Sequence, residues 1–305
     1  MKAIYKFVLI LFISLAIALP GQSYAGGTSD SCATQYPIIL AHGTGGAAEM
    51  MGIVDYWWGI PKALGNEGAE VYVTSVNGMD GTDDKAEQFK KKFLKIKAAL
   101  EKELPTESAP KFNIIGHSHG ALYTRYAISN LGIAENVASY TSIAGPHHGM
   151  FLADALVQAT PELIQQLSGK TLDFVYAYFF GNTQPDALAN LYDVTRAQMD
   201  FFNDNCPNDE NIYYQSYAAR VKLACPNPVL EPTWLFLLSH EGPNDGLVSV
   251  ESAQWGTFKG SESGAWWSPG CDHLAIIGHL FGMTPGFNAP EFYVDIVSDL
   301  KRKGF

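Results

Sequence analysis

The sequence predicts an α/β fold, in which a mostly parallel sheet is flanked by helices. Short runs rich in β-branched residues alternate with longer amphipathic segments through the first half of the chain, as in sheets covered by helices. The 305 residues are 47% hydrophobic and 17% charged, so the chain can bury one large core. We therefore expect a single domain over residues 26–305.

Residues 1–25 are predicted to be a signal peptide that is cleaved on export. Lys2 and Lys6 precede the apolar run Phe7–Leu19, and small residues that end at Ala25 follow it. A transmembrane anchor is the alternative, but this run is shorter than the roughly 20 apolar residues that span a bilayer. Without the peptide, 18 basic and 31 acidic residues leave a formal charge of −13, which disfavours nucleic acid as a partner.

Five apolar runs are predicted strands. They are Ile38–Ala41, Val71–Ser75, Phe112–Ile115, Val137–Ala144 and Ile212–Tyr217. Apolar residues at helical spacing predict a helix between the second and third strands: Phe89, Phe93, Ile96, Leu100 and Leu104. A second helix is expected over Ala121–Leu131, whereas Trp234–Leu238 is too short for its pattern to separate strand from helix.

Residues 150–202 lie outside the alternating pattern and read as helical segments with bulky apolar side chains. These include Leu163, Leu167, Leu172, Phe174, Tyr178, Phe179 and Phe180. The segment is either additional helical core or, in part, a movable apolar lid over a binding site. Both interpretations stay open at this point.

Four cysteines predict two disulfides, because an exported chain meets oxidising conditions and the number is even. The cysteines are Cys32, Cys206, Cys225 and Cys271, and three pairings satisfy them. We favour Cys206 with Cys225, which encloses a short segment rich in Asn and Pro, and Cys32 with Cys271. A zinc site is the alternative, but no C-x-x-C pair is present and the four residues are scattered.

A nucleophile motif follows the third predicted strand. Residues 116–120, Gly-His-Ser-His-Gly, match G-x-S-x-G, with a strand before them and a helix after them. At such a turn the serine hydroxyl is exposed, and side chains at positions 116 and 120 would clash with the neighbouring strand and helix. We expect Ser118 to be a nucleophile and the backbone N–H of His119 to stabilise negative charge on a substrate carbonyl oxygen.

A serine nucleophile needs a histidine base, and the base needs a carboxylate that orients it. The chain order expected after this motif is acid and then histidine. Asp245, within the segment 244–248, and His273, 28 residues later, satisfy this order. His279 is the second choice for the base. Asp272 is disfavoured as the acid because the side chains of neighbouring residues usually point apart.

The second donor to a developing oxyanion is expected in the loop after the first strand. Residues 42–46, His-Gly-Thr-Gly-Gly, supply backbone N–H groups at the carboxyl edge of the sheet, and Thr44 is the candidate. A glycine-rich phosphate loop is the alternative, but the G-x-x-x-x-G-K-[ST] pattern and its lysine are missing. Nucleotide binding is therefore not expected.

Several segments together resemble the secreted bacterial triacylglycerol lipases of family I, the pseudomonad type, which are α/β-hydrolases. The resemblance covers most of the chain after the signal peptide. It is carried by residues 36–43 (YPIILAHG), 55–61 (DYWWGIP), 68–74 (GAEVYVT), 115–120 (IGHSHG), 145–149 (GPHHG) and 244–248 (NDGLV).

This resemblance implies a triad of Ser118, His273 and Asp245, and an oxyanion hole formed by the N–H groups of Thr44 and His119. It also implies a lid among the helices after residue 149, secretion by way of the periplasm, and a lipid or ester substrate at an oil–water or membrane surface. Many members of the family need a membrane-tethered foldase during export, so such a foldase is a candidate partner.

Two features depart from that family. Its calcium site uses two acids and a glutamine, where this chain has Glu231, Ala275 and His279. Losing a carboxylate and presenting an imidazole weakens a site for a cation that prefers several oxygens, so we expect no cofactor and no tightly held calcium. Cys206 matches the first cysteine of the family's disulfide, but Glu251 stands in place of the second, so a Cys206–Cys225 pair would be a replacement bridge.

These features predict a secreted carboxylic ester hydrolase, most specifically a triacylglycerol lipase that works through an acyl-enzyme. A phospholipase or an acyltransferase would use the same three residues, and a catalytically silent lipid-binding protein on the same fold is a third alternative. The apolar side chains after Met150 favour long acyl chains.

Overall fold

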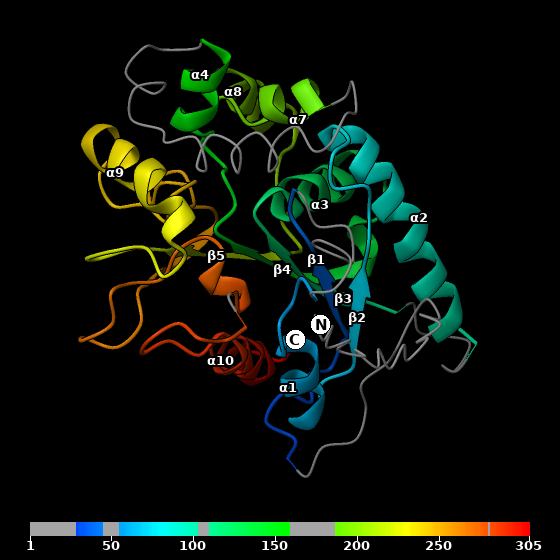
Figure 1. The fold of residues 1–305 in the computed structure, drawn as a ribbon. Helices are drawn as coiled ribbons and strands as arrows, with labels where there is room; N and C mark the ends of the chain where they lie inside the picture. The colour runs from blue at the N-terminus through cyan, green and yellow to red at the C-terminus, as the bar shows by residue number, and fades with distance from the viewer. Residues whose placement is uncertain (1–28, 45–54, 103–109, 159–186, 280) are drawn as a thin grey trace, which may run out of the picture.

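A twisted central sheet with helices on both sides dominates the molecule (Figure 1). The computed structural model describes residues 29–44, 55–102, 110–158, 187–279 and 281–305. The predicted signal peptide lies outside these residues. Among the described helices, none has both the length and the apolar character needed to cross a bilayer.

The described residues form a six-stranded sheet in which every neighbouring pair is parallel, in the order β2-β1-β3-β4-β5-β6. The strands are β1 (Ile38–Ala41), β2 (Val71–Thr74), β3 (Phe112–His117), β4 (Val137–Ile143), β5 (Tyr213–Ala219) and β6 (Thr257–Glu262). The five predicted strands are confirmed to within two residues at each end. The sixth, β6, was not predicted, because it is a polar and partly exposed edge strand.

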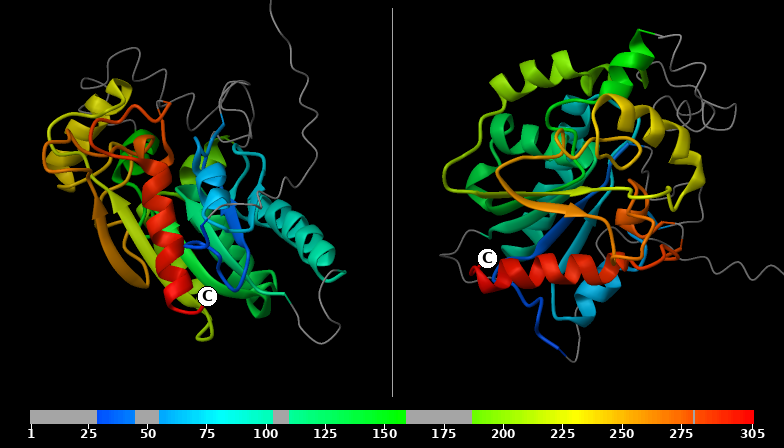
Figure 2. Two further views of the ribbon diagram at one scale, coloured as in Figure 1. Left: turned by 90° about the horizontal axis from the view of Figure 1, so that it is seen from below. Right: turned by 90° about the vertical axis from the view of Figure 1, so that its left-hand side faces the viewer.

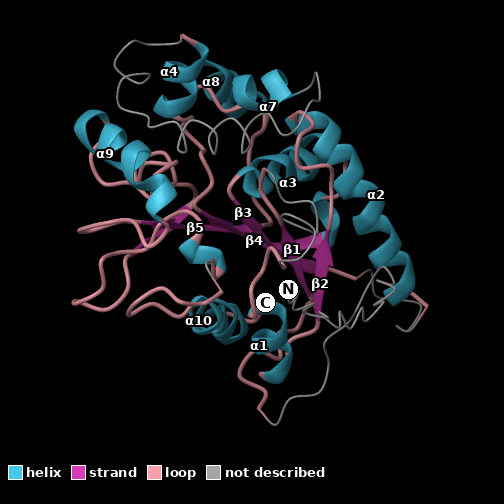
Figure 3. Ribbon diagram, viewed as in Figure 1, coloured by secondary structure: helices cyan, strands magenta, loops and turns pink. Residues whose placement is uncertain are grey.

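Helices cover both faces of this sheet (Figure 3). One face carries α1 (Ile60–Asn66) and α10 (Ala289–Arg302), and the other carries α2 (Thr82–Leu100) and α3 (His119–Asn130). Figure 2 shows α10 lying along the sheet. The predicted helices near 89–104 and 121–131 correspond to α2 and α3, although Leu104 lies outside the described residues.

Alternation along β1 explains the two layers. Ile38 and Leu40 join the apolar cluster under α1 and α10, whereas Ile39 and Ala41 join the cluster under α2 and α3. All four side chains are fully buried. Successive side chains of a strand point to opposite faces, so a strand covered on both faces is a continuous apolar run.

A further group of helices gathers at one side of the sheet and shares a third apolar cluster (Figure 1). These are α4 (Phe151–Val157), α7 (Ala187–Asp193), α8 (Arg196–Asn205) and α9 (Glu231–His240). The described part of the segment 150–202 is therefore mainly helical, as predicted, while residues 159–186 lie outside the described residues. Residues 234–238 belong to α9. The described residues also form three short 3-10 helices: Ala134–Asn136, Pro228–Leu230 and Ala275–Ile277.

Candidate active site

Ser118 lies on the tight turn between β3 and α3. The strand ends at His117, the helix begins at His119, and Ser118 between them has φ 55° and ψ −129°. Few residues other than glycine adopt a positive φ, and such strained residues concentrate at functional sites. The predicted strand-to-helix turn is therefore present, and it holds Ser118 in an unusual backbone conformation.

The two glycines of the motif allow this turn to pack. A Cβ atom at Gly116 would lie 2.7 Å from the backbone nitrogen of Ala121 in α3, and one at Gly120 would lie 2.2 Å from the carbonyl oxygen of Ala41 in β1. Real Cβ contacts are not that short. The predicted clashes with the neighbouring helix and strand are confirmed.

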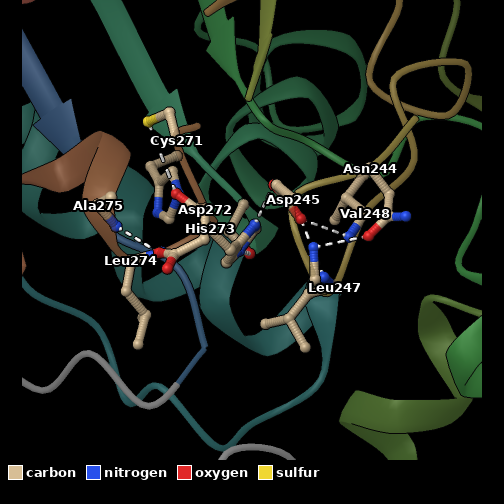
Figure 4. Close-up of polar contacts among 12 residues, drawn as sticks. Asn244, Asp245, Leu247, Val248, Cys271, Asp272, His273, Leu274 and Ala275 are labelled. Atoms are coloured by element: carbon tan, nitrogen blue, oxygen red, sulfur yellow. Dashed lines mark hydrogen bonds and ion pairs between the residues drawn. The ribbon is translucent and has the colours of Figure 1, made fainter. Parts of the chain in front are cut away.

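The structure brings Ser118, His273 and Asp245 together, although they come from three separate loops. His273 Nε2 lies 2.9 Å from Ser118 Oγ, and His273 Nδ1 lies 2.7 Å from Asp245 Oδ2. The other carboxylate oxygen, Asp245 Oδ1, accepts hydrogen bonds from the backbone N–H groups of Leu247 and Val248 at 2.9 and 2.7 Å. Figure 4 shows the Asp245 carboxylate held between the His273 ring and these two N–H groups.

Hydrogen bonding assigns the tautomer of His273. The Asp245 carboxylate can only accept, so the proton lies on Nδ1, and Nε2 presents its lone pair to the Ser118 hydroxyl. All three residues are buried: Ser118 is 5% exposed, His273 0% and Asp245 1%, so the expectation of an exposed serine is wrong for this structure. Their electrostatic interactions are therefore screened weakly by water.

The loop after β1 passes directly against the nucleophile. A Cβ atom at Gly43 would lie 2.7 Å from Ser118 Cβ. The N–H of Gly43 donates to the hydroxyl of Tyr56 at 2.8 Å, and that hydroxyl lies 2.6 Å from Nδ1 of His117. Thr44, the next residue, is buried beside this contact. Thr44 and His119 thus lie on the two segments that meet at Ser118, and their roles as oxyanion donors stay predictions.

A buried polar network lies behind these two residues. Nδ1 of the His119 ring is 2.7 Å from Asn190 Oδ1, and its Nε2 is 2.7 Å from Thr82 Oγ1. The Lys85 ammonium donates to Asn190 Oδ1 at 3.0 Å, and Thr44 Oγ1 donates to the same oxygen at 3.2 Å. One amide oxygen from α7 therefore joins α2, α3 and the loop after β1.

Lys85 is the most unusual member of this network, because a fully buried ammonium normally has a carboxylate against it. Burial lowers the pKa of Lys85 to about 7, and the carboxylates of Asp193 and Asp80 oppose that change only in part. Sequence reasoning missed this residue. The available signal was its position one helical turn before Phe89, on the apolar face of α2.

The other histidines occupy other contacts. His42 Nε2 accepts from the N–H of Val76 at 3.0 Å, and burial lowers the pKa of His42 to about 4. His147 Nε2 lies 2.7 Å from Ser142 Oγ. His279, the second choice for the base, has its Nε2 3.1 Å from the carbonyl oxygen of Tyr56.

The four cysteines correct the predicted disulfides. Cys32, Cys206, Cys225 and Cys271 carry free, buried thiols, and neither predicted pair is bonded. Cys206 Sγ instead lies 3.0 Å from Asn130 Nδ2, and Cys32 Sγ lies 3.5 Å from the carbonyl oxygen of Val294. An even cysteine count does not fix which thiols are adjacent in space, and here each packs as a small side chain of the core.

Comparison with known proteins places this site in context. The model of the palmitoyl protein thioesterase family matches residues 37–221. A triacylglycerol lipase from Pseudarthrobacter phenanthrenivorans is 36% identical over 186 residues, which are 58% of this chain and 55% of that lipase, so the match spans about half of the relative's length. A triacylglycerol lipase from Vibrio cholerae is 31% identical over 290 residues, which cover 81% of this chain and 85% of that protein.

Solved structures show the same fold. The mature form of the Bacillus licheniformis lipase BlEst2 superposes with a TM-score of 0.65 over 92% of this chain and 99% of that chain, at 18% identity. At that identity the likeness concerns the fold, and it agrees with the α/β-hydrolase class predicted from the sequence.

Proposed function

Because this chain belongs to the palmitoyl protein thioesterase family and is related to triacylglycerol lipases, we propose that it is a carboxylic ester hydrolase with Ser118 as its nucleophile. One observation carries the proposal, namely the continuous hydrogen-bonded path from Ser118 Oγ through His273 to the buried carboxylate of Asp245. A hydroxyl that faces the lone pair of an oriented imidazole is an activated nucleophile.

The reaction proceeds in two acyl-transfer steps. Ser118 Oγ attacks the ester carbonyl carbon while His273 Nε2 takes its proton, and Asp245 stabilises the imidazolium that forms. The backbone N–H groups of Thr44 and His119 donate to the oxyanion. His273 then protonates the departing alcohol, which leaves an acyl-enzyme. Water, deprotonated by the same imidazole, attacks the acyl-enzyme and releases the carboxylic acid and free Ser118.

Triacylglycerol is the proposed substrate, since two relatives named triacylglycerol lipase match 58% and 81% of this chain. We further propose that part of the segment 150–202 acts as an apolar lid that favours long acyl chains and opens at a lipid surface. The segment 1–25 directs export, so the protein acts outside the cell as a lipase of the pseudomonad type, and no metal cofactor takes part.

A second candidate is hydrolysis of long-chain thioesters, which the family model favours. The same three residues serve, since a thioester carbonyl is attacked in the same way and its thiolate leaves more readily. Hydrolysis of a glyceride ester and of a thioester would therefore require different binding pockets and the same catalytic residues.

Hydrolysis of glyceride esters of increasing acyl length by the purified chain tests the proposal, with a palmitoyl thioester, a phospholipid and an added alcohol acceptor as separate assays. Ser118→Ala should lower kcat by roughly 10⁴-fold or more. Faster turnover of the thioester, of the phospholipid or by transfer to the alcohol would reassign the substrate class. A wild-type chain whose Ser118 resists labelling by an organophosphonate would instead indicate a silent lipid-binding protein.

A further inference from the structure

The calcium site implied by the family resemblance does not fit the residues of this chain. Ca²⁺ takes six to eight oxygen ligands, with carboxylates among them. At the three matching positions, Ala275 offers only a buried methyl group and the His279 ring points its Nε2 at the carbonyl oxygen of Tyr56. Glu231 alone has a carboxylate, and its Oε2 already accepts from the N–H of Cys225 at 2.6 Å.

A different polar contact joins the same two parts of the chain. Asp272, which directly precedes His273, is 0% exposed. Its Oδ2 accepts from the backbone N–H of Asn227 at 2.6 Å, and its Oδ1 accepts from the Asn227 side-chain amide at 2.8 Å. Oδ1 also accepts from the N–H groups of Leu274 and Ala275 at 3.0 and 2.8 Å. Figure 4 shows the Asp272 carboxylate turned toward Leu274 and Ala275, away from the His273 ring.

The Asn227 amide reaches the far end of the same segment. Its Nδ2 lies 3.3 Å from the carbonyl oxygen of His279, which places one amide between Asp272 and His279. Asn227 itself comes four residues before Glu231. It therefore connects the chain near position 231 with the segment 272–279 that carries His273, which is the connection that a cation bound there would make.

The chemistry of this contact favours amide donors over a cation. Both oxygens of Asp272 are occupied by N–H groups, and hydrogen bonds to a carboxylate are about twice as strong as neutral ones. The amide also directs its N–H hydrogens into the space between Asp272 and the His279 carbonyl oxygen. Positive charge placed there would meet these hydrogens rather than lone pairs.

We infer that the Asn227–Asp272 pair holds the segment carrying His273 in place without calcium, and that Asn227 is a positioning residue for the base. The catalytic part of this inference rests on the proposed function. The structural part does not, because it concerns how residues 272–279 are held.

The first test measures thermal unfolding of the wild-type chain in excess EGTA and in excess calcium chloride. We expect equal melting temperatures and equal rates of ester hydrolysis in the two buffers. A melting temperature that falls in EGTA and recovers with calcium would overturn the inference.

The second test compares two substitutions of Asn227. Asn227→Ala should lower kcat for a soluble short-chain ester by about 10–100-fold with KM little changed, and should slow phosphonylation of Ser118 equally, because the side-chain amide that joins Asp272 to His279 is lost while the backbone N–H at position 227 remains. Asn227→Asp should make the melting temperature depend on calcium, because two carboxylates then face each other. An unchanged kcat for Asn227→Ala well below its melting temperature would show a merely structural contact and overturn the positioning role.

Asn136→Ala is the matched control. Asn136 is also buried and donates from its side-chain amide to a backbone oxygen, that of Pro110, at 3.0 Å, but it directly precedes β4 and so lies at the amino end of that strand, whereas Ser118 follows the carboxyl end of β3. Its loss should lower stability and leave kcat unchanged. If the wild-type chain hydrolyses no ester, the proposed function fails. The EGTA comparison and the hydrogen exchange of the Leu274 and Ala275 amides then still decide whether the pair holds the segment.

Discussion

Asp245 illustrates how much one buried carboxylate determines at the level of single residues. One of its oxygens holds Nδ1 of His273, and the other is held by two backbone N–H groups, so the acid has a fixed orientation before any substrate arrives. Asp245 contributes to catalysis both by its fixed orientation and by its negative charge. A substitution can remove one of these contributions and keep the other.

Asp245→Asn should lower kcat by roughly 10³–10⁴-fold and change KM little. The asparagine oxygen can still accept from Leu247 and Val248, so the loop keeps its shape, but the amide then faces Nδ1 with a donor and favours the unproductive tautomer. Steady-state hydrolysis of a soluble ester measures this. Asp295→Asn, on an exposed position of α10, is the control, and a comparable loss of kcat there would contradict the assignment.

Lys85 predicts a pH dependence of stability. Its pKa is about 7 in the folded chain and near its ordinary value of 10.5 when unfolded, so between these pH values the unfolded state binds one more proton. The free energy of unfolding should therefore rise with pH above about 7, by up to ~1.4 kcal/mol per pH unit from this group. Lys85→Met should remove that rise. Denaturant unfolding at several pH values measures the difference.

The control for this prediction is Lys92→Met, which removes an exposed lysine from the same helix and should leave the rise in place. Asp193, Asp80 and His119 surround Lys85 in both proteins, and Lys85 also lowers the pKa of His119, so the difference between the two pH profiles reports Lys85 together with its effect on these neighbours. Parallel pH profiles for wild type and Lys85→Met would show that Lys85 keeps an ordinary pKa.

Single residues differ in how far the sequence reveals them. Ser118, Asp245 and His273 could be named because a short motif marks the first and chain order limits the other two. Lys85, Asn190 and Asn227 could not, because each acts through partners far apart along the chain and no local pattern marks them. The prediction of two disulfides was wrong for the same reason, since proximity in space is a property of the folded chain.

At the scale of elements, the turn between β3 and α3 shows how backbone packing restricts composition. The carbonyl oxygen of Ala41 in β1 approaches Gly120 so closely that only a hydrogen atom fits. The turn, the strand beside it and the helix after it are therefore positioned as one unit.

Gly120→Ala should destabilise the chain by about 3 kcal/mol or more, because backbone atoms of β1 cannot move away cheaply. Thermal or denaturant unfolding measures this. Gly81→Ala is the control, since Gly81 has an ordinary φ of −65° and a Cβ there meets only side-chain ends, at 3.3 Å from Asp83 and 3.4 Å from Asp193. Equal losses at both positions would mean that close approach at Gly120 is not the cause.

Strands could be predicted from the sequence where both of their faces are buried, and could not be predicted where one face is exposed to water. β1 is a continuous apolar run and β4 is mostly apolar, aromatic or β-branched, because both strands are buried on both faces. β6, with the sequence TFKGSE, forms a sheet edge and carries no such run. Residues 234–238 are helical because they belong to the ten-residue helix α9, and a window of five residues cannot show that length.

For the whole molecule, net charge predicts how the protein approaches a lipid surface. The full sequence has a formal charge of −11, and the part after residue 25 has a formal charge of −13. On emulsions doped with an anionic lipid, the hydrolysis rate should rise with salt, because the screening length falls from about 30 Å at 0.01 M to about 8 Å at 0.15 M ionic strength. Neutral emulsions should show little change. An equal salt response on both surfaces would remove the electrostatic explanation.

The packing of α10 against α1 has a consequence for synthesis of the chain. The N–H of Gln35 also donates to the carbonyl oxygen of Phe305 at 2.8 Å, so residues from both ends of the described chain close one layer together. Translation at about 5–20 residues per second separates the appearance of these two helices by roughly ten to fifty seconds. Until α10 emerges, the nascent chain carries an uncovered apolar sheet face and is open to aggregation on the ribosome.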